Sequence, residues 1–385
     1  MRVAFVTNFA SHYRVKTFEV LAKYYAVQYL FFSGGDEWYW QRRHGARAGA
    51  FDYKYLAGIS VSGTRITPSL IVRLLRGKFD VVVKCINGRF ALPAAYLAAR
   101  LRHRPFVLWT GIWSTLNTRF HKVASFVPSY IYRHADAVVV YGEHVKRFLV
   151  STGVDPQHIF VAAHAVDNVV YARPVPSDEV AGLREKLRIP SGALVVLYLG
   201  RLEAVKGLGY LLEAFAGLRQ LRAHLVLAGA GSERDALSRR ATELGIGERV
   251  TFAGYAPIES APTFYAMADV CVLPSITLPT GKETWGLVVN EAFNQGVPVV
   301  ATDAVGAAAG GLVEDGVNGY IVPERDSAAL GSAVARILND SDLRGRLSQA
   351  ARETIRGWDN ERMVQGFRDA IEFACRSDRR KPSSS

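Results

Sequence analysis

The sequence has few cysteines and no long apolar segment. Its three cysteines, Cys85, Cys271 and Cys375, are too few and too scattered for a disulfide framework or a cysteine-ligated metal cluster. No window reaches the roughly 18 consecutive apolar residues that a membrane-spanning helix needs. The apolar start after Arg2 is too short for a signal peptide and is typical of a first buried strand. We therefore expect a folded protein of the reducing cytoplasm.

The first half of the chain is poor in acidic residues. Residues 1–172 contain 22 Lys and Arg but 9 Asp and Glu, whereas the remainder has 25 against 26. Four of the six tryptophans, Trp38, Trp40, Trp109 and Trp113, also lie in this half. A basic, aromatic-rich half that precedes a neutral one suggests an anionic partner for the first half. The alternative is a solvated basic face over an aromatic core.

Several motifs are incomplete or out of context. The stretch GAGSER has glycines at Gly229 and Gly231 but lacks the third glycine of a dinucleotide-binding fingerprint, which argues against an NAD-dependent oxidoreductase. No recognised DNA- or RNA-binding motif accompanies the basic half. The letters D-x-D occur at Asp340–Asp342, where a turn between two helices is expected rather than a metal-binding loop. We expect no metal and no bound cofactor.

Short apolar runs alternate with helical patterns along the whole chain, which favours an α/β fold with two doubly wound parallel sheets. The expected strands of the first half lie at residues 2–8, 26–33, 79–85, 105–111, 136–142 and 158–164, and those of the second half at 193–202, 224–231, 249–255, 269–275, 297–302 and 319–323. We expect an N-terminal domain over 1–172, a linker over 173–190, a C-terminal domain over 191–357, and a helix and tail over 358–385 that can pack back on the first domain. Two such domains imply a cleft, with function in the loops that follow the strands.

Two loops of the second half carry charges suited to a diphosphate and a sugar. Gly200, Arg201 and Lys206 follow an expected strand and precede a helix, where cations and a helix N-terminus favour phosphate. Glu283 lies before a helix expected to begin near Gly286, and Glu291 lies inside that helix, so both carboxylates can accept hydroxyl hydrogen bonds. The alternative for Arg201 and Lys206 is that they are solvated loop charges. The alternative for the two glutamates is a first-turn acid that interacts with the helix dipole and a second, solvated acid.

The combination is more specific than its parts. GRLEAVKG, the E-x7-E pair and the segment from Gly296 to Pro323 together resemble retaining glycosyltransferases of family 4, which have the GT-B fold of two Rossmann-like domains facing across a cleft. The resemblance implies that Arg201 and Lys206 hold the diphosphate of a nucleotide sugar without a metal. It also implies that Glu283 binds the sugar hydroxyls and Glu291 the ribose. The remaining donor-site residues implied in this way are Gly200, Gly229, Tyr255, Thr284, Trp285, Gly286 and Leu287.

The sequence departs from the family pattern at two places. Where many relatives have His-Gly after a strand of the first domain, this chain has Thr110-Gly111, so that Thr110, the nearby Trp113 or His121 are candidates to line the sugar pocket. Where relatives usually have Asn-Gly-Val-Asp, it has His164-Ala-Val-Asp, which suggests either a cleft histidine or an ordinary buried one.

The acceptor is expected to meet the first domain. His12 and Arg14 follow the first strand in a loop that resembles acceptor loops of polysaccharide and cell-envelope enzymes. The segment 34–49 adds Arg42, Arg43 and Arg47 beside Trp38 and Trp40, a composition suited to an anionic membrane surface.

These observations together predict a metal-independent retaining hexosyltransferase. Its donor would be GDP-mannose or a UDP-hexose, and its acceptor a lipid-linked saccharide at the inner face of the cell membrane, with no nucleic acid partner. A soluble acceptor, or a nucleotide-sugar epimerase on the same fold, are the alternatives.

Overall fold

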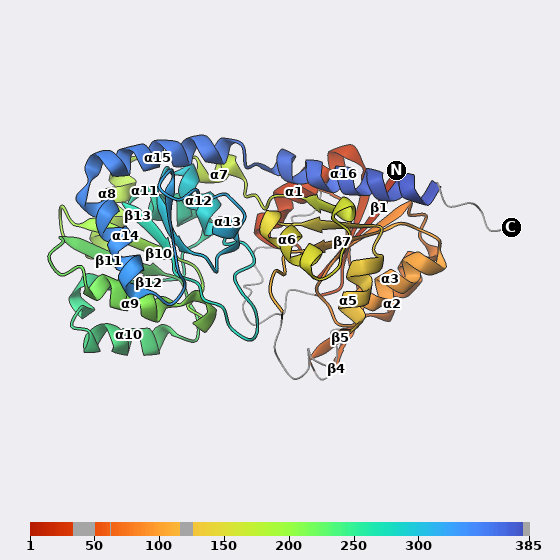
Figure 1. Ribbon diagram of the computed structural model, residues 1–385, viewed down its shortest axis with the longest axis horizontal. Coiled ribbons are helices and arrows are strands. Elements are labelled where there is room, and N and C mark those ends of the chain that lie inside the picture. The colour runs from red at the N-terminus through yellow and green to blue at the C-terminus, as the bar shows by residue number, and fades with distance from the viewer. Residues whose placement is uncertain (34–50, 62, 116–125, 380–385) are drawn as a thin grey trace. The chain divides into compact units, whose positions relative to one another are not determined.

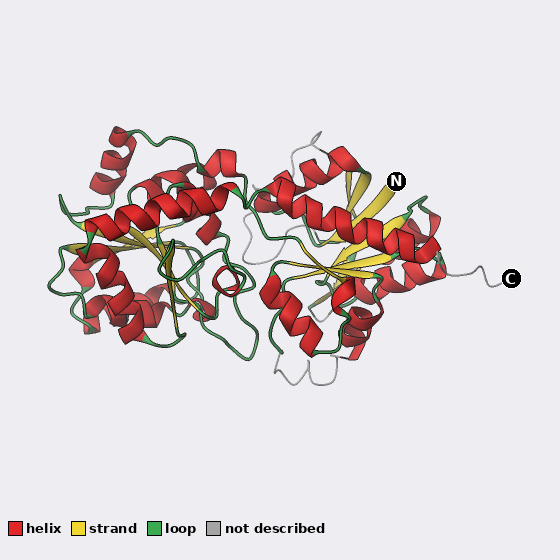
Figure 2. Cartoon of the chain, turned by 45° about the horizontal axis from the view of Figure 1, so that its top comes forward, coloured by secondary structure: helices red, strands yellow, loops and turns green. Residues whose placement is uncertain are grey.

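A computed structural model describes residues 1–33, 51–61, 63–115 and 126–379. The chain divides into two compact units, the first formed by residues 1–165 together with 360–385, the second by 166–359. Each unit has a parallel sheet with helices packed on it (Figures 1 and 2). Within the described residues, no helix has the length and apolar character needed to cross a membrane.

The first unit contains a seven-stranded sheet in the order β3-β2-β1-β6-β7-β8-β9. Its strands are β1 (Arg2–Thr7), β2 (Ala26–Phe31), β3 (Tyr53–Tyr55), β6 (Val81–Cys85), β7 (Phe106–Thr110), β8 (Ala137–Val140) and β9 (Ile159–Val161), and β4 (Ile59–Val61) pairs with β5 (Thr64–Ile66) in a separate antiparallel hairpin. Its helices are α1 (His12–Tyr24), α2 (Pro68–Arg76), α3 (Ala91–Leu101), α5 (Phe126–His134), α6 (Glu143–Ser151) and α16 (Asn360–Arg379). The six expected strands are present, because each is an apolar run buried on both faces of a parallel sheet.

The second unit contains a six-stranded parallel sheet in the order β12-β11-β10-β13-β14-β15. Its strands are β10 (Leu194–Leu199), β11 (Ala223–Ala228), β12 (Val250–Gly254), β13 (Val270–Leu273), β14 (Val299–Thr302) and β15 (Gly319–Val322). Its helices are α7 (Asn168–Tyr171), α8 (Ser177–Lys186), α9 (Leu208–Ala216), α10 (Arg234–Glu243), α11 (Ala261–Ala266), α12 (Val288–Asn294), α13 (Gly306–Ala309), α14 (Ser327–Asn339) and α15 (Ser341–Arg356). The Rossmann-like strand order is therefore present in both units.

The D-x-D letters lie at a junction between two helices, as the sequence predicts. Helix α14 ends at Asn339 and α15 begins at Ser341. The Asp340 carboxylate accepts a hydrogen bond from the Leu343 amide at 2.9 Å, which caps the N-terminus of α15. Asp340 thus has a structural role.

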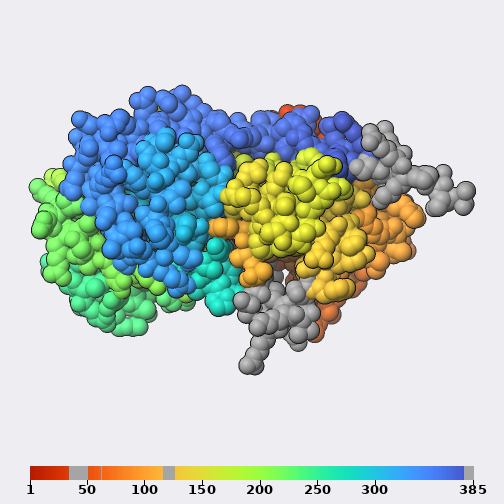
Figure 3. All heavy atoms as spheres, viewed as in Figure 1, coloured from red at the N-terminus to blue at the C-terminus, as the bar shows by residue number. Residues whose placement is uncertain are grey.

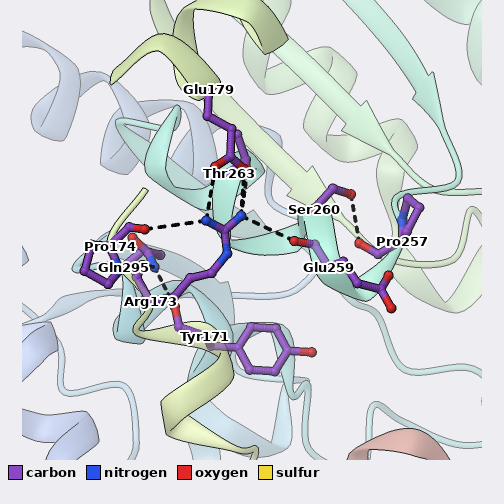
Figure 4. A network of polar contacts seen from close by, with 9 residues as sticks. All are labelled: Tyr171, Arg173, Pro174, Glu179, Pro257, Glu259, Ser260, Thr263 and Gln295. Carbon is purple, nitrogen blue, oxygen red and sulfur yellow. Dashed lines mark hydrogen bonds and ion pairs between the residues drawn. The ribbon is translucent and has the colours of Figure 1, made fainter. Parts of the chain in front are cut away.

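The segment expected to be a linker belongs to the second unit. Residues 173–190 contain helix α8, and the contact-based boundary lies between Ala165 and Val166 rather than at residue 172. The Arg173 guanidinium forms two hydrogen bonds with the Glu179 carboxylate, at 2.6 and 3.1 Å, and a third with Thr263 of α11 at 3.2 Å (Figure 4). Gln295 donates to the carbonyls of Tyr171 and Arg173 at 2.5 and 2.9 Å. These contacts, which the three prolines nearby do not reveal, fix the segment on α11 and the end of α12.

Helix α16 completes the core of the first unit although it follows the second unit in the chain. It packs against α1, β7, β8 and β9. Phe367 is fully buried, with ring centroids 5.7 Å from Phe5 and 5.2 Å from Trp109. A Cβ on Gly366 would lie 2.2 Å from the Val161 carbonyl oxygen, so only glycine allows the helix to approach β9 so closely.

We predict that Phe367→Ala destabilises the first unit by about 3–5 kcal/mol, because it leaves a cavity between Phe5 and Trp109. The measurement is urea unfolding followed by tryptophan fluorescence. The matched control is Phe126→Ala, since Phe126 is 74% exposed and its loss should change stability by less than about 0.5 kcal/mol. Equal unfolding midpoints for both variants would contradict the core position of α16.

Candidate functional site

The second sheet has a topological switch point between β10 and β13. From β10 the chain continues to β11 and β12 on one side, and β13, β14 and β15 follow on the other side. The loops after β10 (residues 200–207) and after β13 (residues 274–287) therefore start side by side and diverge. Ligands of open α/β sheets bind in the crevice at such a point.

Close backbone contacts hold these loops. Gly229 has a φ of 153°, and a Cβ there would lie 1.8 Å from the Gly200 carbonyl oxygen. The Leu202 amide donates to the Ala230 carbonyl at 2.9 Å, and the Ile276 amide donates to the Val205 carbonyl at 2.9 Å. The loop after β10 is thus held between the loops after β11 and β13. Gly229, a predicted donor-site residue, allows the first of these contacts.

Lys206 and Glu283 meet across the switch point. Lys206 ends a short 3-10 turn, Ala204–Lys206, in the loop after β10, and Glu283 lies in the loop after β13. The lysine Nζ donates to Glu283 Oε2, and the side chains are 13% and 15% exposed respectively. The Gly306 amide donates to the Glu283 carbonyl at 3.2 Å, so the loop is also anchored on α13. The sequence predicts both residues as parts of one site, and the structure brings them into contact.

Helix α12 begins at Val288, two residues later than expected. Gly286 has a φ of 92°, which is why the chain is not yet helical there. Trp285 is 1% exposed, and its Nε1 donates to Asn290 Oδ1 at 2.8 Å. Trp285 is therefore fixed by a residue of the helix that follows it, and the ring lies in the interior of the second unit.

Glu291 is buried rather than solvated. It is 8% exposed, and its Oε2 accepts a hydrogen bond from the Tyr265 hydroxyl at 2.7 Å. Burial raises its pKa to about 7, although hydrogen bonds from Tyr265 and Tyr171 act in the opposite direction. The alternative of a solvated acid is thus wrong. In this structure the carboxylate expected to bind a ribose is engaged by tyrosine.

The position of Tyr171 depends on the polar network of Figure 4. Its backbone carbonyl accepts from Gln295, while its ring points away from the Arg173 guanidinium. Its hydroxyl takes part in the hydrogen bonding of Glu291, which together with burial raises the tyrosine pKa. The sequence analysis does not find Tyr171 and Tyr265, because a tyrosine within a short helix gives no signal of what its hydroxyl contacts.

The other predicted donor-site residues lie along the same edge of the sheet. Arg201 is exposed directly after Gly200, and its carbonyl accepts from the Tyr198 hydroxyl at 2.6 Å. Thr284 and Leu287 are half-buried in the loop after β13. Tyr255 follows β12, two strands away from β10, and is 46% exposed.

Within the described residues, no group of three or more His, Cys, Asp or Glu side chains is arranged to hold a metal ion.

Two of the acceptor-side candidates, Arg14 and His164, lie in the interior of the first unit. Arg14 is 8% exposed, donates to Thr7 Oγ1 and the Tyr141 hydroxyl at 3.3 Å each, and lies 4.6 Å from the centre of the Trp109 ring. His164 is also buried, 4.5 Å from the Tyr141 ring, and burial followed by the charge of Arg14 lowers its pKa to about 3. His164 is therefore an uncharged buried histidine, one of the two expected possibilities.

The remaining candidates are divided between interior and surface. Thr110 is fully buried, and its Oγ1 lies 2.8 Å from the Tyr132 hydroxyl. Trp113 is half-buried with its ring centroid 4.9 Å from that of His144, and His12 is half-buried at the start of α1. His121, and the segment 34–49 with Trp38, Trp40, Arg42, Arg43, His44 and Arg47, lie outside the described residues.

Lys84 is a buried cation that the sequence analysis did not single out. It lies on β6, is 0% exposed, and donates to the carbonyls of Cys85 and Asn87 at 2.5 and 2.7 Å. Burial lowers its pKa to about 7. A single lysine in the apolar run VVVKC was the signal that could have found it.

Comparison with known proteins gives the family. Residues 31–169 match the family model described as Glycosyltransferase Family 4, and residues 181–354 match the one described as Glycosyl transferases group 1. The chain thus contains a glycosyltransferase family 4 domain and a group 1 glycosyltransferase domain. The two units with Rossmann-like sheets are those of the GT-B fold that this family implies.

Named relatives are similar in sequence to about half of this chain. It is 38% identical over 178 residues to the lipopolysaccharide core biosynthesis glycosyltransferase LpsE of Rhizobium meliloti, covering 46% of this chain and 49% of that protein. It is 35% identical over 219 residues to a D-inositol 3-phosphate glycosyltransferase of Xylanimonas cellulosilytica, covering 54% of this chain and 50% of that protein. The chain thus spans about half the length of the curated relatives it matches.

Solved structures share the fold over nearly the whole glycosyltransferase chain. Anabaena HepE in complex with UDP superimposes with a TM-score of 0.79 at 21% identity, covering 97% of this chain and 100% of that one. Sucrose-phosphate synthase from Thermosynechococcus elongatus gives a TM-score of 0.76 at 20% identity, covering 97% and 98%.

We predict that Glu291→Gln stabilises the protein at neutral pH but not at acidic pH. The pKa of Glu291 is about 7 in the folded protein, and its usual value is near 4.5. At a pH between these two values, the folded protein therefore keeps a proton that the unfolded chain has lost. Wild-type stability therefore falls as pH rises from about 4.5 to 7. The stability gain of the glutamine variant should grow over this window to on the order of 1–3 kcal/mol and stay constant above it.

Urea unfolding at a series of pH values measures this effect. The control is Glu185→Gln on the exposed surface of α8, whose difference from wild type should not change with pH. A pH-independent difference for Glu291→Gln would show that Glu291 has an ordinary pKa.

Proposed function

We propose that this chain transfers a hexose from a nucleotide sugar to a saccharide acceptor with retention of anomeric configuration. The observation that carries the proposal is the Lys206–Glu283 pair at the switch point of the second sheet. The pair joins a cation suited to a diphosphate and a carboxylate suited to sugar hydroxyls, and it lies within the segment that matches the group 1 family model.

The reaction breaks the bond between the anomeric carbon and the diphosphate and forms a bond from that carbon to an acceptor hydroxyl oxygen. Negative charge grows on the departing diphosphate, and the sugar acquires oxocarbenium character. Lys206 and Arg201 stabilise the former because they are fixed cations at the loop after β10. Retention requires the acceptor hydroxyl to approach on the face from which the diphosphate leaves, so the leaving oxygen is the nearest base for its proton.

Glu283 has a double role in this proposal. Without donor it holds Lys206 in place through the ion pair. With donor bound, Lys206 turns to the diphosphate and Glu283 accepts hydrogen bonds from sugar hydroxyls. Glu291 accepts from the ribose, which requires it to exchange one of its tyrosine hydrogen bonds, and Tyr255 lies beside the base.

The donor is GDP-mannose or a UDP-hexose. UDP is the first nucleotide to test, because structures of the fold neighbour HepE contain UDP and UDP-glucose. A thermal-shift panel of UDP, GDP, ADP and dTDP distinguishes the nucleotides, since a ligand at 100 times its dissociation constant adds about 2.7 kcal/mol of stability.

The acceptor is a lipid-linked saccharide, and the enzyme acts as a cytoplasmic protein at the inner face of the cell membrane. The excess of Lys and Arg over Asp and Glu in residues 1–172 supports this assignment. It is also supported by the relative LpsE, which is named as a glycosyltransferase of lipopolysaccharide core biosynthesis. A soluble acceptor, or epimerisation of the nucleotide sugar, would be recognised by product analysis with and without a lipid-linked acceptor.

We predict that Lys206→Ala and Glu283→Gln each lower the turnover number about 10²–10³-fold, as is usual when one preorganised charged contact to a transition state is lost. The double variant should lose less than the product of the two effects, because the residues contact each other. Turnover is measured by release of the nucleoside diphosphate.

The matched controls are Lys186→Ala and Glu185→Gln, both exposed on α8, and both should turn over at the wild-type rate. Near wild-type turnover in either site variant would refute the proposed donor site.

We predict that transfer continues in EDTA, because Lys206 and Arg201 already supply positive charge for the leaving diphosphate. The measurement is the rate before and after dialysis against the chelator. Complete loss of activity that Mg²⁺ or Mn²⁺ alone restores would mean that a metal neutralises the diphosphate instead.

A further inference from the structure

The outer face of the first unit carries a group of exposed apolar side chains on two neighbouring helices. Helix α3 packs between α2 and α5 (Figure 1), and the rings of Tyr96 on α3 and Tyr130 on α5 lie 6.2 Å apart. The exposed apolar residues are Leu97 (58%), Leu101 (61%), Phe126 (74%), Val127 (43%) and Tyr130 (45%). We call these five residues the α3–α5 face; Figure 3 views this side of the unit.

Helical spacing places these side chains together on each helix. Leu97 and Leu101 are four residues apart, as are Phe126 and Tyr130, so each pair projects from one side of its helix. The stacked ring of His134, 4.0 Å from that of Tyr130, continues the second pair by one turn. Exposed large apolar side chains that gather on neighbouring helices and are bordered by polar residues are typical of a contact surface.

The charge around the face has one sign. Residues 91–104 and 126–135 contain four arginines, Arg100, Arg102, Arg104 and Arg133, and no aspartate or glutamate. Arg102, Arg104 and Arg133 are exposed. The acid that follows, Asp136, is engaged by Arg100 Nη1 at 2.7 Å and by the Phe106 amide at 2.8 Å. The exposed border of the apolar residues is therefore cationic.

We propose that the α3–α5 face docks on an anionic lipid surface. Leucine, phenylalanine and tyrosine enter the boundary between headgroups and acyl chains, and the arginines bind lipid phosphates. A second copy of the chain fits less well, because a two-fold interface would bring identical arginine-rich borders together. The inference gives the membrane association of the proposed function a defined surface, and that surface lies in residues other than the segment 34–49.

Vesicle co-sedimentation tests the docking surface with the full chain. The probes are vesicles of phosphatidylcholine alone and of phosphatidylcholine with phosphatidylglycerol, each at low and high salt. Wild type should bind the anionic vesicles and release partly as salt rises. Leu97→Ser/Leu101→Ser/Phe126→Ser should lose most binding. Arg102→Ser/Arg104→Ser should bind anionic vesicles roughly thirtyfold more weakly, from about 1 kcal/mol per arginine.

Matched controls lie in the second unit. Val169→Ser/Val317→Ser removes two apolar residues that are 82% and 50% exposed, and Lys186→Ser/Arg239→Ser removes two exposed cations. Both should bind vesicles as wild type does. All variants should keep the wild-type melting temperature and its shift with UDP, which separates docking from folding and from donor binding.

Three results would overturn the inference. Undiminished binding by both α3–α5 variants would place the membrane contact elsewhere and leave membrane association standing. Failure of wild type to bind anionic vesicles, with transfer intact, would favour a soluble acceptor. Self-association that the leucine variant abolishes, without vesicle binding, would make the face a contact between copies.

Discussion

The ion pair between Lys206 and Glu283 depends on the strand order of the second sheet. The two residues are 77 positions apart in the chain, yet their loops start from neighbouring strands because β10 and β13 lie at the centre of the sheet, where the chain changes direction. Backbone contacts fix both loops: a Cβ on Gly207 would lie 2.1 Å from the Pro274 carbonyl oxygen, and one on Gly306 would lie 2.2 Å from that of Thr284. The two loops are thus fixed by backbone contacts that do not involve the ion pair, so the charged side chains can exchange partners without loss of the loop structure.

The two glutamates of the E-x7-E pair show how environment separates identical side chains. Glu283 pairs with a cation in a partly open loop, whereas Glu291 lies among tyrosines, where burial raises its pKa to about 7. A buried carboxyl group with a pKa of about 7 changes its charge within the physiological range. The proposed exchange of a tyrosine hydroxyl for a ribose hydroxyl would be chemically conservative, because one O–H donor would replace another.

The positions of the strands along the chain and of the charged loops were predictable from the sequence, because apolar runs and the residues between them reflect local structure. Burial was not. Arg14 and Thr110 were expected near a ligand, and His164 was expected either in the cleft or buried; all three are buried in the first unit. Arg14 and His164 pack against Trp109 and Tyr141, and Thr110 lies 2.8 Å from the Tyr132 hydroxyl. Most of these partners are distant in the chain, so the local sequence does not reveal them. The prolines near segment 173–190 suggest a linker. The contacts of Arg173 with Glu179 and Thr263, which the sequence does not reveal, attach the segment to α11.

The chain enters the second unit at Val166 and returns to the first at Asn360. During synthesis, β1 to β9 emerge long before Phe367, the residue that fills the space between Phe5 and Trp109. The second unit is contiguous in sequence and has its complete set of strands while the first sheet still exposes the apolar surface that α16 covers. Nascent chains should therefore fold their second unit first, and a ribosome stalled before residue 360 should present a folded second unit and an incomplete first unit that chaperones can recognise.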